Sequence, residues 1–216
     1  MKKKIAVVLS GCGVYDGAEI HEATLTLLAI HQQGADYQCF APDVKQAHVI
    51  NHLTGEEMPE SRNVLLESAR IARGNILALS SFNASEYDAI IFPGGFGVAK
   101  NLSDYAFRGA ECRVNPEVEM AVKVMVKAGK PIGALCIAPV VIARILGDVE
   151  VTIGSDQSTA ADIRNMGGTH ISRTHGEVAI DQRRKVVSTP CYMLNANIDQ
   201  IYKGAQNTVK ALLSLM

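Results

Sequence analysis

The sequence has no long apolar run, and none of its stretches approaches the roughly 20 apolar residues that a membrane-spanning helix needs. It also has no excess of charge, since 21 basic residues stand against 22 acidic ones for a formal net charge of -1. Proteins that bind nucleic acids or anionic lipids usually carry a basic patch, and this mixed charge supplies none. We therefore expect neither a nucleic acid nor a membrane as a partner.

Cysteine is infrequent and widely scattered along the chain. No two cysteines have C-x-x-C spacing, and no cluster of Cys and His has the spacing of zinc ligands. We therefore expect no metal site, and we expect reduced thiols in a reducing compartment. The five cysteines are Cys12, Cys39, Cys112, Cys136 and Cys191.

The first residues resemble a secretion signal, because lysines precede an apolar run that ends in Leu-Ser-Gly-Cys at Cys12. The apolar part, residues 5–9, is shorter than the roughly 7–15 residues of a real signal. A buried first strand explains the run better, and we expect a cytoplasmic protein.

Apolar runs with β-branched residues alternate with segments of helical spacing. The runs are typical of strands buried on both faces of a parallel sheet. Together the segments predict an α/β fold, a doubly wound, flavodoxin-like and mostly parallel sheet with helices on both faces in a three-layer sandwich. The expected strands are 5–9, 36–40, 88–92, 131–135, 150–153, 177–180 and 185–189, and the expected helices include 116–128, 139–146, 159–166 and a last one from Leu194 to the end.

The chain has no repeat and no linker, so we expect one domain over residues 1–216. Residues 41–75 are too long for a simple connection between a helix and a strand. This segment is polar and its second half has helical spacing. We expect an insertion that covers a pocket or forms an interface.

The carboxyl ends of parallel strands carry the ligand sites of such sheets. Cys136 lies at one of them, in "PIGALCIAPVVIARIL", between an expected strand and an expected helix. A thiol at a helix N-terminus meets unpaired N–H groups and the positive end of the helix dipole, which lower its pKa. Cys136 is therefore a candidate nucleophile; a buried core cysteine is the alternative.

Two other loops reach the same edge of the sheet. In "PGGFG", Gly94 and Gly95 let the backbone approach a ligand, and the N–H groups of Gly95 and Ile137 are candidate donors to an oxyanion. An ordinary tight turn is the alternative. Glu19 and Glu22 follow the first glycine-rich loop; we expect helix capping from Glu19 and proton transfer beside the thiol from Glu22.

These pieces together resemble a known superfamily. "IIFPGGFGVAKNLSD" and "GALCIAPVVIARILG" resemble the glycine turn and nucleophile elbow of the DJ-one/PfpI superfamily, which has the class I glutamine amidotransferase-like fold. "LSGCGVYDGAEIHEA", "INHLTGE", "TIGSD" and "TPCYML" resemble its ElbB (ES-one-like) group over essentially the whole chain. The resemblance implies a cofactor-free glyoxalase that forms a homodimer and is linked to isoprenoid biosynthesis.

The resemblance implies Cys136 as nucleophile, Glu22 as its acid partner, and Gly95 with Ile137 as oxyanion donors. Protease-like members have histidine where this chain has Ile137, which argues against peptidase activity. A Cys–His dyad is therefore missing. His52 or His21 could substitute in space, although solvated or structural roles are the simpler interpretation of both.

The implied reaction converts glyoxal to glycolate through a hemithioacetal on Cys136, with Glu22 moving a proton between the two carbons. The substrate is a small 2-oxoaldehyde, and the enzyme is a glyoxalase III-like lyase of the hydro-lyase type with low activity. The alternative is a non-enzymatic or weakly enzymatic sensor of oxidative stress in which Cys136 becomes a sulfinate. An amidotransferase subunit is disfavoured, because no convincing His-x-Glu follows late in the chain.

Overall fold

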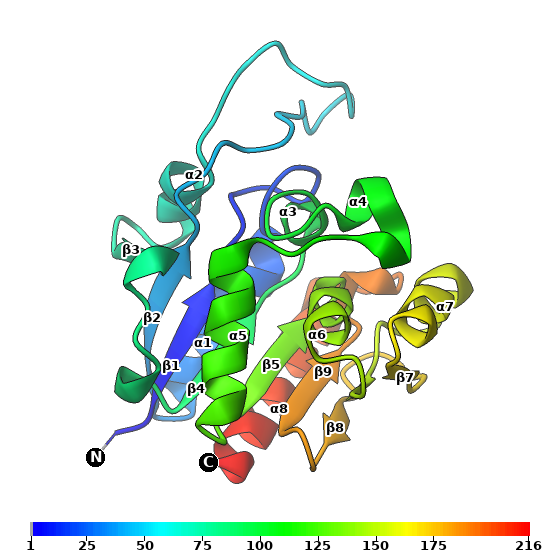
Figure 1. The fold of residues 1–216 in the computed structure, drawn as a ribbon. Coiled ribbons are helices and arrows are strands. Elements are labelled where there is room, and N and C mark those ends of the chain that lie inside the picture. Colours follow the sequence, from blue (N-terminus) through cyan, green and yellow to red (C-terminus); the bar gives the residue numbers. More distant parts are fainter. Residues whose placement is uncertain (1) are drawn as a thin grey trace.

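A seven-stranded sheet with the order β3-β2-β1-β4-β5-β9-β8 forms the centre of the computed structural model, which describes residues 2–216 (Figure 1). All neighbouring strands are parallel except β8 and β9, so the predicted α/β fold is confirmed. The strands are β1 (Lys4–Val8), β2 (Asp36–Ala41), β3 (Ile76–Ala78), β4 (Ala89–Phe92), β5 (Ile132–Leu135), β8 (Ala179–Asp181) and β9 (Val186–Thr189).

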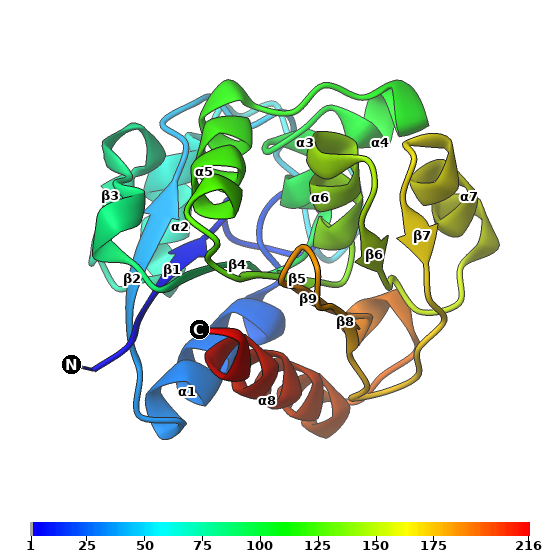
Figure 2. The same cartoon turned by 60° about the horizontal axis from the view of Figure 1, so that its bottom comes forward.

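Side chains of β1 alternate between two cores. Ile5 and Val7 pack on the face covered by α1 (Ile20–Gln32) and α8 (Ile198–Leu215), whereas Ala6 and Val8 pack on the face covered by α5 (Pro116–Lys127) and α6 (Ala138–Leu146). Figure 2 shows these two helical layers below and above the sheet. Because both faces are covered, the central strands are apolar throughout, as the sequence predicts.

Several shorter elements complete the fold. The helices α2 (Val64–Ile71), α3 (Phe96–Lys100), α4 (Tyr105–Arg108) and α7 (Gln157–Asn165) and the two-stranded sheet of β6 (Glu150–Val151) and β7 (Thr169–His170) lie around the main layers. The structure also has 3-10 turns η1 (Leu79–Ser81), η2 (Ala84–Glu86), η3 (Gly109–Glu111) and η4 (Cys191–Met193). The shortest of these elements have no readable periodicity in the sequence, and β3, β7, α3 and α4 were not predicted.

The last helix begins at Ile198, and its predicted start at Leu194 is wrong. Asn197 and Gln200 form a capping box that sets the boundary. Leu194 instead packs against the backbone of Gly154, where an added Cβ would lie 2.8 Å from its Cδ2. None of the helices within residues 2–216 combines the length and the apolar character needed to cross a bilayer.

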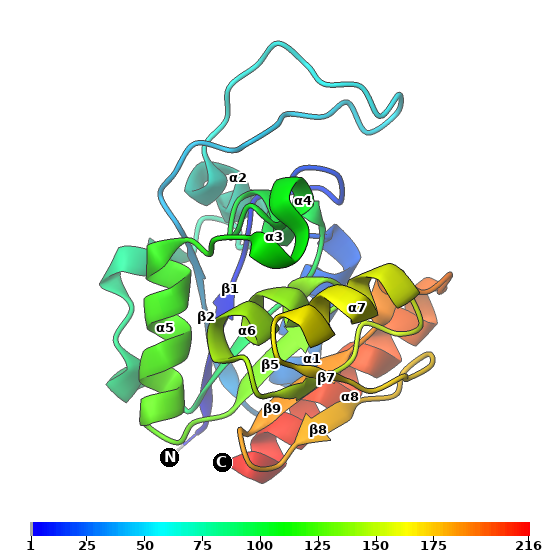
Figure 3. The same ribbon diagram turned by 45° about the vertical axis from the view of Figure 1, so that its right-hand side comes forward.

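The segment 41–75, expected as an insertion, contains the helix α2 and a long loop that extends away from the sheet (Figures 1 and 3). Two isolated bridges, Lys45 to Asn63 and Ile50 to Glu57, join the two sides of the loop. The helix predicted for the second half of residues 41–75 is confirmed by α2. The chain then adds β3 to the edge of the sheet beside β2.

Candidate functional site

A cavity of about 390 Å³ opens at the carboxyl edge of the sheet, above Cys136. The loops after β1, β4 and β5 all contribute to it, as the topology predicts. Its lining residues are Val14, Glu19, Gly95, Phe96, Ala99, Tyr105, Ala106, Cys136, Ile137, Asp156, Thr159, Tyr192 and Met193.

Cys136 occupies a sharp turn between β5 and α6. Its backbone φ of 59° lies in the left-handed region, which is costly for a residue with a Cβ. The turn is held because the Cys136 N–H donates to the Thr189 carbonyl oxygen at 2.9 Å, one step beyond the β5–β9 ladder. Strained backbone of this kind concentrates at functional sites. The side chain is 7% exposed and borders the cavity.

Glu22 lies in the first turn of α1 and is 0% exposed. Its Oε2 accepts the N–H of Gly94 at 2.9 Å, and its Oε1 accepts the N–H of Tyr192 at 3.2 Å. A further hydrogen bond joins the carboxyl to the side chain of Cys136. Burial, aided by the charge of Glu19, raises the pKa of Glu22 to about 8. The carboxyl is therefore mostly protonated at neutral pH.

The thiol of Cys136 has a raised pKa, and the predicted lowering at the helix N-terminus is wrong. Burial is the main cause and the charge of Glu22 adds to it. The N–H groups of Gly95 and Ile137 do donate to the sulfur and lower the pKa, but their effect is smaller than that of burial. Once Glu22 is protonated, its charge no longer opposes the thiolate. At neutral pH the pair therefore holds two protons, and in the form with one proton a thiolate can accept from the N–H groups of Gly95 and Ile137 and from the protonated Glu22.

The glycine turn fits closely around this pair. A Cβ on Gly94 would lie 2.4 Å from the Cβ of Cys136 and 2.6 Å from Oε2 of Glu22. Gly95 has a φ of 100°, and a Cβ there would lie 2.4 Å from the Glu19 nitrogen. Gly94, which we expected to let the backbone approach a ligand, gives its N–H to Glu22 and so holds the acid. Gly95 and Ile137 keep their N–H groups directed at the sulfur.

Four helices begin at the wall of the cavity. Glu19 caps α1 by accepting the N–H of Glu22 at 2.7 Å, and Asp156 caps α7 by accepting the N–H of Thr159 at 2.7 Å. Within residues 2–216, no side chain caps α3 at Gly95 or α6 at Ile137. The first N–H groups of α3, those of Phe96 and Gly97, donate to the carbonyl oxygens of Val14 and Gly17. The positive end of α6, where the Ile137 N–H is directed at the sulfur, stays available to a negative charge at Cys136.

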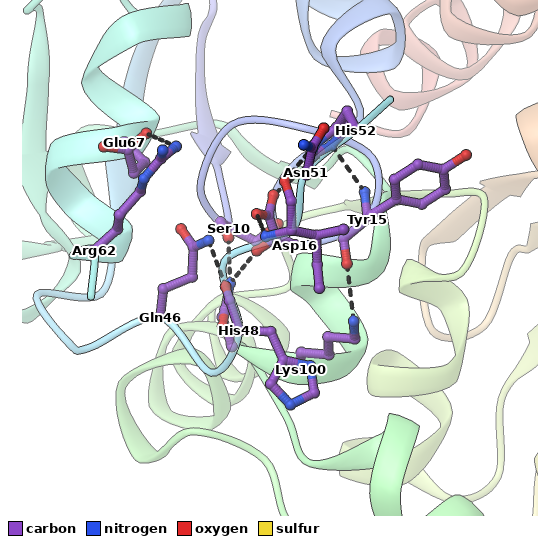
Figure 4. Close-up of polar contacts among 12 residues, drawn as sticks. Ser10, Tyr15, Asp16, Gln46, His48, Asn51, His52, Arg62, Glu67 and Lys100 are labelled. Atoms are coloured by element: carbon purple, nitrogen blue, oxygen red, sulfur yellow. Dashed lines mark hydrogen bonds and ion pairs between the residues drawn. The ribbon is translucent and has the colours of Figure 1, made fainter. Parts of the chain in front are cut away.

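His52 lies outside the cavity lining as residues 2–216 define it. Its Nε2 is 3.2 Å from the backbone nitrogen of Tyr15 and its Nδ1 is 3.0 Å from the Ile50 carbonyl oxygen (Figure 4). Because Tyr15 N–H is a donor, Nε2 accepts and Nδ1 carries the proton. His52 thus joins the projecting loop to the first glycine-rich loop, next to Asp16.

His21 is also outside the cavity lining formed by residues 2–216, but its side chain contacts the lining residue Tyr192. Its Nδ1 lies 2.8 Å from the hydroxyl of Tyr192, whose backbone N–H holds Glu22. Tyr192 and Asp156 are lining residues that the sequence analysis did not single out. Asp156 has a readable signal, since it precedes the expected helix 159–166 at an N-cap position; Tyr192 has none.

Within residues 2–216, no group of three or more His, Cys, Asp or Glu side chains is arranged to hold a metal ion, and all five thiols are free. The chemistry available at this site is therefore that of a thiol, a buried carboxylic acid and two backbone donors. Such a set can add a sulfur nucleophile to a carbonyl and then move protons on the adduct.

The chain is similar to three curated proteins over nearly its whole length. It is 49% identical to the glutamine amidotransferase-like class 1 domain-containing protein 3, mitochondrial, of Homo sapiens, over 98% of this chain and 83% of that protein. It is 48% identical to the ES1 protein homolog, mitochondrial, of Rattus norvegicus, over 99% and 84%, and 36% identical to the ES1 protein, mitochondrial, of Danio rerio, over 98% and 85%. No family model matches the chain.

Solved structures share the fold. An isoprenoid biosynthesis protein with an amidotransferase-like domain from Ehrlichia chaffeensis superposes with a TM-score of 0.93 at 37% identity, over 99% of both chains. DJ-1beta of Drosophila melanogaster superposes with a TM-score of 0.59 at 16% identity, over 100% of this chain and 96% of that chain. The predicted ElbB and DJ-one/PfpI resemblance is confirmed at the level of family and fold.

The predicted cytoplasmic location is wrong by the same comparison, because all three curated relatives are named mitochondrial. The prediction rested on the short apolar run at residues 5–9 and on reduced thiols, and free thiols report the redox state of a compartment without identifying it. The relatives from Homo sapiens and Rattus norvegicus align with almost the whole chain, and nearly half of the aligned residues are identical. The chain belongs to the ES1 family of glutamine amidotransferase-like class 1 domain proteins.

Proposed function

We propose that this protein is a cofactor-independent glyoxalase, which converts a 2-oxoaldehyde such as glyoxal and water to the 2-hydroxy acid. The observation that carries the proposal is the hydrogen bond between the Cys136 thiol and the fully buried Glu22, beside two N–H groups directed at the sulfur. Nucleophile, proton carrier and oxyanion donors are then within reach of one carbonyl group.

The reaction begins from the pair with one proton, as thiolate and carboxylic acid. The sulfur forms a bond to the aldehyde carbon, and the oxyanion takes the proton of Glu22, which gives a hemithioacetal and a carboxylate. Glu22 then removes the hydrogen on that carbon and returns it to the neighbouring carbon, while the hydroxyl proton passes from the first oxygen to the second, which leaves a thioester of the hydroxy acid. Water breaks the thioester, releases glycolate and restores the thiol, so the redox change is internal to the substrate.

The test is incubation of the purified protein with glyoxal, followed by NMR, beside Cys136→Ala and the matched variant Cys112→Ala. Cys112 is a buried cysteine that is not part of the cavity lining. We expect glycolate from the parent protein and from Cys112→Ala, and a loss of at least about a hundredfold in Cys136→Ala. Full turnover by Cys136→Ala rules the proposal out.

The lyase has low activity in this proposal, because the cavity lining drawn from residues 2–216 includes no histidine to act as a stronger base. A homodimer, inferred from the family resemblance, stays a prediction that sedimentation equilibrium can test.

The second candidate is a sensor of oxidants. The same hydrogen bond favours it, since a protonated Glu22 can donate to a sulfinate on Cys136. Titration with peroxide and measurement of the intact mass distinguish the two. Oxidation of Cys136 alone at low dose, together with negligible turnover of glyoxal, supports the sensor.

A further inference from the structure

The cavity is larger than glyoxal requires. Its volume of about 390 Å³ falls within the range of roughly 300–1,000 Å³ found for pockets that bind whole small molecules. Glyoxal consists of two carbonyl groups and fills a small part of this space. Beyond Cys136 the wall is apolar, formed by Val14, Phe96, Ala99 and Met193. A substrate that fills the cavity therefore carries an apolar body attached to its aldehyde.

The wall presents both backbone N–H groups and carboxylates. Beside Cys136, the N–H groups of Gly95 and Ile137 are directed at the sulfur. The wall also has two acidic side chains, Glu19, whose charge acts on Glu22, and Asp156, and among residues 2–216 no Lys, Arg or His lines it. The amine of Lys100 lies 5.3 Å from the ring of Phe96 and is bound to the Tyr15 carbonyl oxygen at 2.9 Å.

Of the two acids, Asp156 is the one whose carboxylate can still accept a hydrogen bond from a ligand. It is exposed, and hydrogen bonds from the backbone and side chain of Thr159 lower its pKa, so it is ionised. A carboxylate accepts about four hydrogen bonds, and the cap of α7 uses only part of that capacity. The neighbouring hydroxyl of Tyr105 donates to Asp162 at 2.7 Å. Asp156 thus remains as an acceptor in the wall of the cavity.

We infer that the cavity selects 2-oxoaldehydes that are larger than glyoxal, carry no negative charge and present a hydrogen-bond donor to Asp156. The aldehyde oxygen is directed to the N–H groups beside Cys136, the apolar body packs on Phe96, and a carboxylate or phosphate on the substrate is repelled by Asp156. The inference rests on the proposed function, since it orients the same aldehyde for attack.

The test compares 4-hydroxyphenylglyoxal with 4-carboxyphenylglyoxal, which differ at the far end alone. We expect kcat/KM of the parent protein to favour the hydroxyl compound by at least about tenfold, because a hydrogen bond is replaced by repulsion. In Asp156→Asn that ratio should fall by about tenfold. Asparagine is as good an N-cap as aspartate, so α7 keeps its cap while the charge is removed.

The matched control is Asp36→Asn, which removes the same charge at the amino end of β2, where Asp36 pairs with Lys2 on the surface. It should leave the ratio unchanged. Equal kcat/KM for the two compounds in the parent protein, or a ratio that Asp156→Asn does not change, overturns the inference.

A binding measurement separates this inference from the proposed reaction. The unreactive ketones 4-hydroxyacetophenone and 4-acetylbenzoate can be titrated into the parent protein and into Asp156→Asn by NMR. Preference of the parent for the hydroxyl ketone, reduced in the variant, supports the Asp156 subsite even if no aldehyde is turned over. Equal binding of both ketones contradicts it even if glyoxal is a substrate.

Discussion

Cys136 and Glu22 are far apart in the chain and meet around Gly94, where an added Cβ would lie 2.4 Å from the Cβ of Cys136 and 2.6 Å from Oε2 of Glu22. Neither group is in its ordinary protonation range. Burial raises the pKa of both, and the donors around them oppose that rise without cancelling it. At this scale the site is a buried pair of a thiol and a carboxylic acid. The N–H groups of Gly94 and Tyr192 bind the carboxyl, and those of Gly95 and Ile137 are directed at the sulfur.

The pH dependence of turnover follows from the protonation of this pair. With two protons the pair is a neutral thiol and a neutral acid, and with one it can react. Because the pKa of Glu22 is about 8, kcat/KM for glyoxal should rise tenfold per pH unit below that value and level off above it. The measurement is a pH–rate profile. A profile that is flat from about pH 6 to pH 9 would mean that this proton does not control the reaction.

Glu22 also links stability to pH. Its pKa is raised from 4.5 to about 8 on folding, so the folded state holds a proton that the unfolded state has lost between these values. Folding stability therefore falls as pH rises through this window. Glu22→Gln does not show this loss of folding stability. Between about pH 5 and pH 8, its unfolding free energy should therefore rise relative to that of the parent by on the order of 3 kcal/mol.

Urea denaturation at several pH values measures the effect. The control is Glu57→Gln, which makes the same change at an exposed position on the projecting loop. The two variants should diverge as pH rises. Parallel stability curves for Glu22→Gln and the parent would show that Glu22 is not protonated in the fold.

At the scale of elements, helix ends decide the character of the cavity. Its wall holds the N-termini of α1, α3, α6 and α7, and carboxylates cap two of them. Those two ends are neutralised by their caps, while Gly95 and Ile137, the N-cap residues of the other two, direct their N–H groups at the sulfur. The elements thus place hydrogen-bond donors at the nucleophile and carboxylates at the starts of α1 and α7.

Asn101 is one of the side chains that fasten the projecting loop to this region. Asn101 is 9% exposed; its Nδ2 donates to the carbonyl oxygens of Ser10 and Asp16 at 2.8 and 2.9 Å, and its Oδ1 accepts the N–H of Ala47 at 2.9 Å. Asn101→Ala leaves three backbone groups without this partner. We expect a loss of about 2–4 kcal/mol in unfolding free energy and faster proteolysis of residues 42–63.

Asn83→Ala serves as the control, since Asn83 caps the exposed turn η2, accepting the Ser85 N–H at 3.1 Å, and its other side-chain hydrogen bonds, with Ser85 and Glu86, are local to that turn. That variant should lose about 1 kcal/mol and leave the loop protected. Equal losses in both variants would place the anchor of the loop elsewhere.

At the scale of the whole molecule, α8 must pack tightly on the centre of the sheet. A Cβ on Gly133 of β5 would lie 2.7 Å from Cγ1 of Ile91 and 2.9 Å from Cδ1 of Leu212. Gly133→Ala should therefore cost about 1–3 kcal/mol through overpacking, seen as a lower Tm. Because Leu212→Ala removes one of the two clashing groups, the double variant should lose less than the sum of the single losses. Additive losses would show that Leu212 does not limit the space.

The sequence by itself determined the architecture and the position of the site. Strand and helix patterns are local, so the alternation of residues 5–9, 88–92 and 131–135 with helices was enough to predict a parallel sheet. The rule that ligands lie beyond the carboxyl ends of the strands then selected Cys136, Glu22 and the glycine turn. No long-range contact had to be known for these steps.

Only the tertiary structure decided the protonation of the pair and the partners of each group. The raised pKa of Cys136 depends on how deeply other elements bury it, and the binding of Gly94 to Glu22 depends on the place where α1 meets β4. The same holds for His52, which the loop carries to Tyr15, and for Asp156, which α7 brings to the cavity. Burial and hydrogen-bond partners arise from residues far apart in the chain, and local patterns do not contain them.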